Sequence, residues 1–187
     1  MARALVTGSG ERVAAVAALL EKEGHEVRTA TGPDELDNLS DLGGVAHYIQ
    51  LPSRVHPVGD SLVGRVRSFL SDGLLGRFAV VDQVLPALAD GATVVLVSGN
   101  TPDTALPDDH RSRLALLHVL AHATRAELGG RGVDVVVASG DRHDEQIVGY
   151  ALHGGEDATA RLSADAVTDE QYEDWRIETM GLRSGLA

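Results

Sequence analysis

Residues 109–138 read DHRSRLALLHVLAHATRAELGGRGVDVVVA, and this stretch decides the fold class. Its first twenty residues place leucine and alanine three and four positions apart, which predicts a long helix over residues 109–128. Glycines then break the pattern, and the valine-rich residues 133–138 predict a strand that is buried on both faces. A long helix followed at once by an apolar strand is typical of a parallel sheet with helical crossovers.

The same alternation continues toward the amino terminus. Gly24 and Pro52 end two of the segments, because glycine tolerates the left-handed conformation after a helix and proline cannot pair within a central strand. Alternating strands and helices imply right-handed crossovers, so the sequence predicts a doubly wound parallel sheet, Rossmann-like, in one α/β domain over residues 1–156. The predicted strands are 2–6, 26–30, 44–51 and 92–97, and the predicted helices are 11–23, 65–70 and 73–89.

Residues 157–187 are predicted as a C-terminal extension with one short helix. Thr168 followed by Gln171 predicts a capping box that opens this helix. Tyr172 and Trp175 lie three positions apart and therefore share a helix face. We expect these two aromatic side chains to dock the helix onto the domain or onto a partner rather than to stack a cofactor.

Composition excludes several classes of function. The chain holds 16 basic and 28 acidic residues, and its formal net charge of −12 argues against binding the phosphate backbone of a nucleic acid. It has no cysteine, which excludes a disulfide, a thiol nucleophile and a zinc–thiolate site. Its apolar runs are too short to span a bilayer, and its amino terminus carries no export signal. The sequence therefore predicts a cytoplasmic protein that binds neither a membrane nor nucleic acid.

The turn after the first predicted strand has the composition of an anion site. Thr7 and Gly8 lie between a strand and a helix, where backbone N–H groups and the helix amino end would face a dinucleotide pyrophosphate. Gly10 and Arg12 could also contact a phosphate there, the first by its backbone and the second by its charge. Arg28 follows the second strand, where the ribose 2′-phosphate of NADP would be recognised.

Residues 120–135 resemble the long interface helix and following strand of the short-chain dehydrogenase/reductase family. Residues 84–88 and 91–98 are similar to that family's preceding helix and its serine-bearing strand. Residues 147–155 are similar to its last strand and terminal Gly-Gly. This resemblance implies a Rossmann fold, NAD or NADP as cofactor, and oxidoreductase chemistry in which a serine polarises the substrate carbonyl and a tyrosine transfers the proton.

The cofactor turn departs from the family pattern. The family carries Thr-Gly-x-x-x-Gly-x-Gly, but counting from Thr7 places Arg12 and Ala14 at the second and third glycines. A side chain at the middle glycine obstructs the approach of the pyrophosphate to the backbone. The family's Asn-Asn-Ala-Gly appears here as Gln50 to Ser53. The resemblance therefore leaves two expectations for the cofactor open, none or NADP.

The catalytic set departs further. Ser98 occupies the serine position, but the family's Tyr-x-x-x-Lys is replaced either by His110 with Leu114 or, one residue earlier, by Asp109 with Arg113. The sole lysine of the chain is Lys22, in the first predicted helix. The short interval between the strand at 133–138 and an expected strand from Ile147 also predicts that the family's substrate-covering loop is missing.

We therefore favour a shortened, catalytically degenerate relative that serves as a non-catalytic binding or assembly subunit. It is expected to form a homodimer, a homotetramer or a heteromer with a homologous subunit through the helices at 73–89 and 109–128. One alternative is an atypical NADP-dependent oxidoreductase in which His110 replaces the phenol, since an imidazole donates a proton near neutral pH. Another is a non-redox isomerase or cyclase that uses Ser98, Asp109 and His110.

Two polar groups are assigned structural roles. His118 and His122 lie four positions apart on one helix face, a spacing that suits two metal ligands. Because no third ligand lies near them in the sequence, we predict no metal site and place them on the helix surface that faces a second subunit. The polar residues 141–145 are predicted to form a surface turn.

Overall fold

The computed structural model describes residues 1–36, 44–53, 56, 58–99, 107–128 and 130–154. The side chains of Leu74 and of residues 107–116 are outside this description, and so is the whole predicted extension with its helix at Thr168. One five-stranded sheet with the order β2-β1-β3-β4-β5 forms the centre, and all four strand pairs are parallel. This confirms the predicted Rossmann-like α/β class. The strands are β1 (Arg3–Thr7), β2 (Glu26–Ala30), β3 (Val45–Gln50), β4 (Leu88–Val97) and β5 (Asp134–Ala138).

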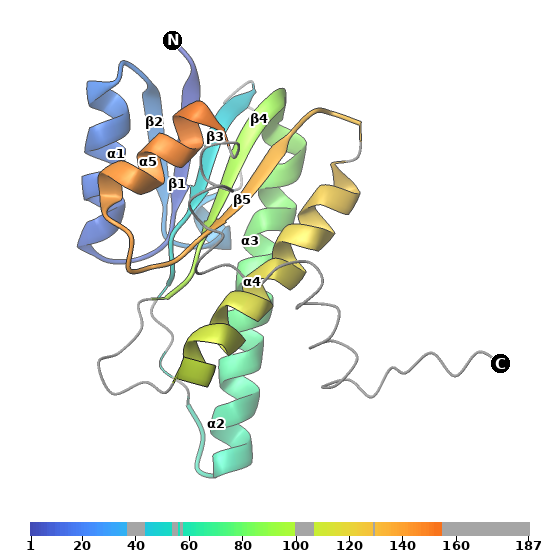
Figure 1. The fold of residues 1–187 in the computed structure, drawn as a ribbon. Helices are drawn as coiled ribbons and strands as arrows, with labels where there is room; N and C mark the ends of the chain where they lie inside the picture. The colour runs from blue at the N-terminus through green and yellow to red at the C-terminus, as the bar shows by residue number, and fades with distance from the viewer. Residues whose placement is uncertain (37–43, 54–55, 57, 100–106, 129, 155–187) are drawn as a thin grey trace, which may run out of the picture.

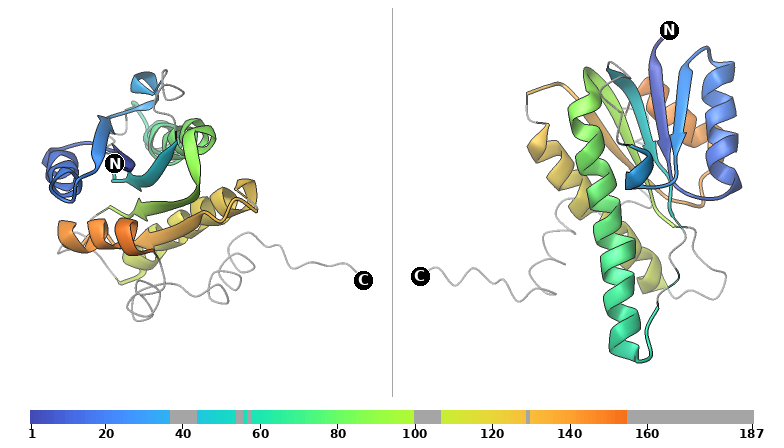
Figure 2. Two further views of the ribbon diagram at one scale, coloured as in Figure 1. Left: turned by 90° about the horizontal axis from the view of Figure 1, so that it is seen from above. Right: turned by 180° about the vertical axis from the view of Figure 1, so that it is seen from behind.

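Helices cover both faces of the sheet (Figure 1). On one face, α1 and α5 pack against each other and on the strands, and on the other face α3 and α4 pack beside each other (Figure 2). Successive side chains of a strand point to opposite faces, so Tyr48 joins the core under α3 and α4, and Ile49 joins the core under α1 and α5. The helices are α1 (Glu11–Lys22), α3 (Gly76–Val84), α4 (Pro107–Glu127) and α5 (Asp144–His153).

A long composite helix replaces the two helices predicted at 65–70 and 73–89. The α-helix α2 (Leu62–Ser68) continues through a π-helical segment, Phe69–Leu75, into α3 without a break. Ser61 caps it by accepting a hydrogen bond from the Gly64 N–H at 3.1 Å. The helix ends earlier than predicted, in the 3-10 turn Leu85–Ala87, and β4 starts directly at Leu88. A second 3-10 turn, Pro33–Glu35, follows β2.

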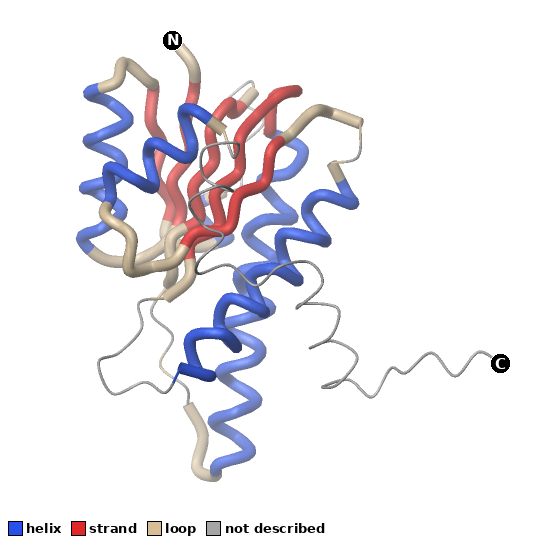
Figure 3. Tube along the Cα trace, viewed as in Figure 1, coloured by secondary structure: helices blue, strands red, loops and turns tan. Residues whose placement is uncertain are grey.

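The expected strand from Ile147 is wrong, because these residues form the helix α5 (Figure 3, helices in blue). The capping box at its start joins the His143 N–H to the Gln146 side chain at 3.1 Å. Ile147, Val148 and Ala151 are all buried, which is the spacing of a helix face rather than of a strand. The prediction that a covering loop is missing was based on this strand, so the structure no longer supports that prediction.

Within the part of the chain that the structure describes, no helix is both long enough and apolar enough to cross a membrane.

Candidate functional site at the carboxyl ends of the strands

The β1–α1 turn is tight and depends on glycine. Gly8 has a φ of 141°, and its N–H donates to the Ala30 carbonyl at 3.1 Å. A Cβ on Gly8 would lie 2.8 Å from the Leu51 Cβ, so a larger residue would push β1 and the end of β3 apart. Gly10 precedes α1 with a φ of 94°. The predicted residues Thr7, Gly8 and Gly10 therefore place the amino end of α1 at the carboxyl edge of the sheet, as in an anion site.

Arg12 points away from this turn, toward the loop between β5 and α5. Its Nε donates to the Asp144 carboxylate at 2.6 Å, and one terminal nitrogen donates to the Gly140 carbonyl at 2.5 Å. The other terminal nitrogen donates to the Arg142 carbonyl. These three bonds use the planar fork of the guanidinium to fasten α1 to the loop. The stretch 141–145, predicted as a surface turn, thus supplies partners for the residue that replaces the family's middle glycine.

The prediction that Arg28 follows the second strand is wrong, because Arg28 is the middle residue of β2, and its side chain is held by the turn after the strand. Its terminal nitrogen donates to the Glu35 carbonyl at 3.2 Å. The Glu35 carboxylate in turn accepts from the Thr31 hydroxyl at 2.6 Å and the Thr31 N–H at 2.9 Å, and the hydroxyl bond is the main cause of its lowered pKa. Arg28 is therefore part of the β2 turn, and its predicted contact with a 2′-phosphate stays a prediction.

Ser98 follows β4 and is buried. Its hydroxyl accepts a hydrogen bond from the Gly140 N–H at 2.8 Å and donates to the Gly99 carbonyl at 3.2 Å. Its own N–H donates to the Ala138 carbonyl at 2.9 Å. The side chain thus joins the ends of β4 and β5.

The other two candidate catalytic residues, Asp109 and His110, lie in the first turn of α4. This helix begins at Pro107, a position that suits proline because the first helical N–H has no intrahelical partner. Their side chains lie outside the described residues, so their predicted roles beside Ser98 stay predictions.

A buried polar network that the sequence reading missed occupies the edge between Thr7 and Ser98. The Arg77 Nε donates to the Gln50 side-chain oxygen at 3.1 Å, and a terminal nitrogen donates to the Val97 carbonyl at 2.9 Å. The Gln50 amide donates back to the Arg77 carbonyl at 3.1 Å. Burial lowers the pKa of Arg77 to about 10, although the neighbouring Tyr48 partly opposes the shift.

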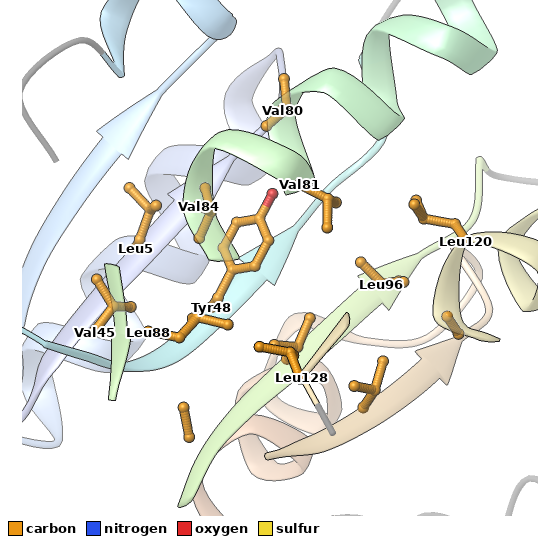
Figure 4. Close-up of a cluster of buried hydrophobic side chains, with 14 of the residues drawn as sticks. Leu5, Val45, Tyr48, Val80, Val81, Val84, Leu88, Leu96, Leu120 and Leu128 are labelled. Atoms are coloured by element: carbon orange, nitrogen blue, oxygen red, sulfur yellow. The ribbon is translucent and has the colours of Figure 1, made fainter. Parts of the chain in front are cut away.

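Tyr48 connects this network to the β1–α1 turn. Its hydroxyl and the Thr7 hydroxyl form a buried hydrogen bond of 3.0 Å. Its ring lies between Val81 and Val84 (Figure 4). Burial raises the pKa of Tyr48 well above its ordinary value, while the bond to Thr7 works against that rise. The phenol is therefore a neutral structural group and is not poised to transfer a proton.

The sequence did contain a signal for this network. Arg77 lies three, four and seven positions before Val80, Val81 and Val84, so it shares the face by which α3 packs on the sheet. A charged residue on such a face needs buried partners. Gln50, at the end of an apolar strand, is the matching polar residue.

A cavity of about 300 Å³ opens beside the network. It lies over the carboxyl ends of β1, β2 and β3, and Arg77 forms part of its wall. Ser98, which directly follows β4, is not among the described residues that line the cavity. Its other walls include Thr7, Gly8, Gly32 and Gln50.

The side of α4 that was expected to meet a second subunit is only partly available. Leu117, Ala121 and Leu128 lie on the helix that was expected to form the interface, but the structure buries them in the chain's own core against the sheet. The helix needs these leucines to cover β4 and β5, which is why the apolar stripe points inward. His118 is half-buried and His122 is exposed, so the outer face of α4 is mainly polar.

Comparison with the models of known protein families gives no match, and no curated protein matches the sequence. Several solved structures match the fold. A short-chain dehydrogenase/reductase from Serratia marcescens is 16% identical, with a TM-score of 0.58 over 81% of this chain and 88% of that one. A small-chain dehydrogenase is 20% identical over the same shares, also with a TM-score of 0.58. A putative short-chain alcohol dehydrogenase from Burkholderia multivorans is 14% identical, with a TM-score of 0.55 over 81% and 89%.

Proposed function

We propose that this chain, which has the fold of the short-chain dehydrogenase/reductases, is a non-catalytic binding or assembly subunit. The observation that carries the proposal is the position of Arg77. Its side chain lines the cavity, and its guanidinium bonds to the carbonyl of Val97, the residue directly before Ser98. A ligand held in the cavity would therefore contact an arginine that is already bonded to Gln50 and Val97.

The hydrogen bonds of the Ser98 hydroxyl also oppose a role in polarising a substrate carbonyl. To polarise a substrate carbonyl, the hydroxyl must donate to the carbonyl oxygen in the dehydrogenase mechanism that the resemblance implies. Here the hydroxyl accepts from Gly140 and donates to Gly99. Redirecting the donor would break the bond to Gly99 at a buried position, which costs about 1 kcal/mol or more.

The sole lysine of the chain lies at the wrong edge of the sheet. Lys22 is in the last turn of α1, close in sequence to Glu26, where β2 begins. The start of a parallel strand marks the amino edge, whereas Ser98 follows the end of β4 at the carboxyl edge. Lys22 therefore lies away from Ser98 and does not replace the family's catalytic lysine.

For assembly we propose the outer faces of α3 and α4, which cover the same side of the sheet. His122 and Ala126 are exposed on α4, and Ala79 and Asp82 are exposed on α3. A non-obligate interface taken as a whole is about as apolar as the rest of a protein surface, so a mixed surface of this kind is compatible with one. The partner is a second copy or a homologous subunit.

Sedimentation velocity at micromolar concentration tests the assembly. We expect the protein to sediment as a dimer or a larger oligomer. Ala126→Asp, which adds a desolvated charge to the interface, should weaken association at least tenfold, the equivalent of about 1.4 kcal/mol. Ala18→Asp places the same charge on an exposed position of α1, on the opposite face of the sheet, and should leave association unchanged. A protein that stays monomeric and binds no homologous subunit would rule the assembly role out.

The cavity favours one second candidate, an atypical NADP-dependent oxidoreductase. Thr7, Gly8 and Gly32 border the cavity at the place where a Rossmann fold holds a dinucleotide. If NADP binds there, Gly10 and the amino end of α1 would face the pyrophosphate and Arg28 the 2′-phosphate. His110 would then supply the proton in place of the phenol.

A further inference from the structure

The amino-terminal half of the composite helix carries an exposed apolar row. Five side chains, here called the α2 row, are between 46 and 72% exposed. Their spacing places them within about one third of the helix circumference. The composite helix extends past the carboxyl ends of the strands, so the sheet does not cover this row (Figure 1). The α2 row consists of Leu62, Val63, Val66, Phe69 and Leu70.

The row is flanked by positive charge in an acidic protein. Arg65 and Arg67 lie on the two sides of the row, and both are exposed. Asp72 is the sole acidic residue between Leu62 and Leu75. An apolar stripe edged by arginines suits an amphipathic helix that carries acidic residues beside its own apolar stripe.

The carboxyl-terminal residues of this chain have that composition. Residues 168–182 hold five carboxylates and one arginine. In the helix that the capping box predicts, Tyr172, Trp175 and Leu182 share one face, and Glu178 borders it on one side and Asp169 on the other. We propose that residues 168–182 dock on the α2 row of the same chain, with the aromatic side chains on the row and the carboxylates near Arg65 and Arg67.

The connecting chain is long enough for this docking. The described structure ends at Gly154, beside Asp134 at the beginning of β5. Phe69 lies about 27 Å along the composite helix from its end at Ala87, at about 1.5 Å per residue. The residues from Gly154 to Thr168 reach about 46 Å when extended. A tether of this length holds the segment at an effective concentration in the millimolar range, which favours its own chain over a second copy.

Trp175 is the sole tryptophan of the chain, so intrinsic tryptophan fluorescence of the full-length protein reports on this segment alone. We expect its emission to lie at shorter wavelength than in the urea-unfolded protein, to resist acrylamide quenching, and to be independent of protein concentration. Val66→Asp in the α2 row should shift the emission to longer wavelength and restore quenching. Ala18→Asp on α1, which adds the same charge away from the row, should leave both unchanged.

A disulfide trap supplies a second readout that does not depend on Val66→Asp folding. Because the chain has no cysteine, Val66→Cys combined with Trp175→Cys can form only one disulfide within a chain, and any other disulfide must join two chains. We expect an intramolecular product that forms faster than with Ala18→Cys and Trp175→Cys.

Three results would overturn the proposal: a Trp175 that is as accessible as in urea, an emission that Val66→Asp does not change, or an intermolecular disulfide. The last would show that a second copy covers the row. The outcome is separate from the proposed assembly role, because a monomer with a shielded Trp175 contradicts the assembly and supports the docking. An oligomer with an exposed Trp175 does the reverse.

Discussion

Arg77 enters the core from α3, and its guanidinium serves acceptors on two strands, Gln50 on β3 and Val97 on β4. Through Gln50 it fixes the end of β3, and through Val97 it fixes the residue before Ser98. The Thr7–Tyr48 hydrogen bond extends the same polar layer to β1. The polar side chains at this edge of the sheet thus bond to one another and hold the ends of β1, β3 and β4 together.

Arg77→Lys tests this structural role. The lysine keeps the buried charge, but one ammonium group cannot reproduce the planar fork that reaches both acceptors. We expect the free energy of unfolding to fall by about 2 kcal/mol, since a charge-assisted hydrogen bond is lost at a buried position. Arg3→Lys, whose exposed salt bridge to Glu26 is worth about 0.5 kcal/mol or less, is the matched control. Urea denaturation measures both, and equal effects would contradict the role of Arg77.

His47 makes stability depend on pH. It is half-buried on β3, its Nδ1 bonds to the Ala151 carbonyl at 2.8 Å, and the His25 ring stands edge-on with ring centroids 4.9 Å apart. Burial is the main cause that lowers the pKa of His47 below its usual 6.5, and His25 adds to the shift while the bond to Ala151 opposes it. As the pH falls below 6.5, the unfolded chain therefore takes up a proton before the folded one, and stability falls.

His47→Asn tests the origin of this pH dependence. Asparagine can still donate to Ala151 but does not titrate. Urea denaturation at about pH 7.5 and about pH 5.5 gives the unfolding free energy at each pH. We expect the decrease between the two to be smaller in this variant than in the wild-type protein. His122→Asn, on the exposed face of α4, should keep the wild-type loss. A wild-type protein that is equally stable at both values would contradict the assignment.

At the level of elements, the loop between β5 and α5 is ordered by a residue far away in the sequence. Arg12 on α1 bonds to Gly140, Arg142 and Asp144, and Ser98 bonds to Gly140 from the other side. These contacts fasten α1 to the loop, and Arg12 also lines an open cavity of about 740 Å³ between them. The arginine therefore stabilises the contact between α1 and the loop that leads into α5.

Arg12→Met should loosen that loop. Because the salt bridge to Asp144 is about one quarter exposed, we expect a modest loss of about 1 to 2 kcal/mol in unfolding free energy. Amide hydrogen exchange should rise in residues 139–146 and stay unchanged in β1 and β3. Lys22→Met, on the exposed last turn of the same helix, should change neither. If exchange in the loop does not rise, the guanidinium does not hold it.

The elements show how far sequence alone could lead. The five described strands follow from short apolar runs, and α1 follows from its periodicity and from Gly24. The strand expected from Ile147 rests on the resemblance of residues 147–155 to the last strand of the family. A short apolar run fits a strand or a helix, and its packing on α1 shows that it is a helix. The composite helix was divided at Gly73, where a π-helical segment carries the chain through. The partners of Arg77 could not be predicted without the order of the strands in the sheet, since Gln50 and Val97 are distant from it in sequence.

At the scale of the whole molecule, the two faces of the sheet differ in what they carry. On the face under α1 and α5, the two helices pack on each other and Arg12 fastens α1 to the loop before α5. The face under α3 and α4 carries the polar layer of Arg77, the proposed assembly surface and the α2 row. The fold is that of the short-chain dehydrogenase/reductases, and the proposed non-catalytic role depends on how the carboxyl edge between these faces is filled.

Calorimetric titration of NADPH into the full-length protein tests that claim most directly. Because Arg77 lines the cavity and is bonded to Val97, and because Arg12 is bonded to the loop between β5 and α5, we predict no saturable heat at nucleotide concentrations up to about 1 mM. This limit corresponds to about 4 kcal/mol of binding free energy. Saturable binding of one NADPH per chain at micromolar concentration would contradict it and would favour the oxidoreductase.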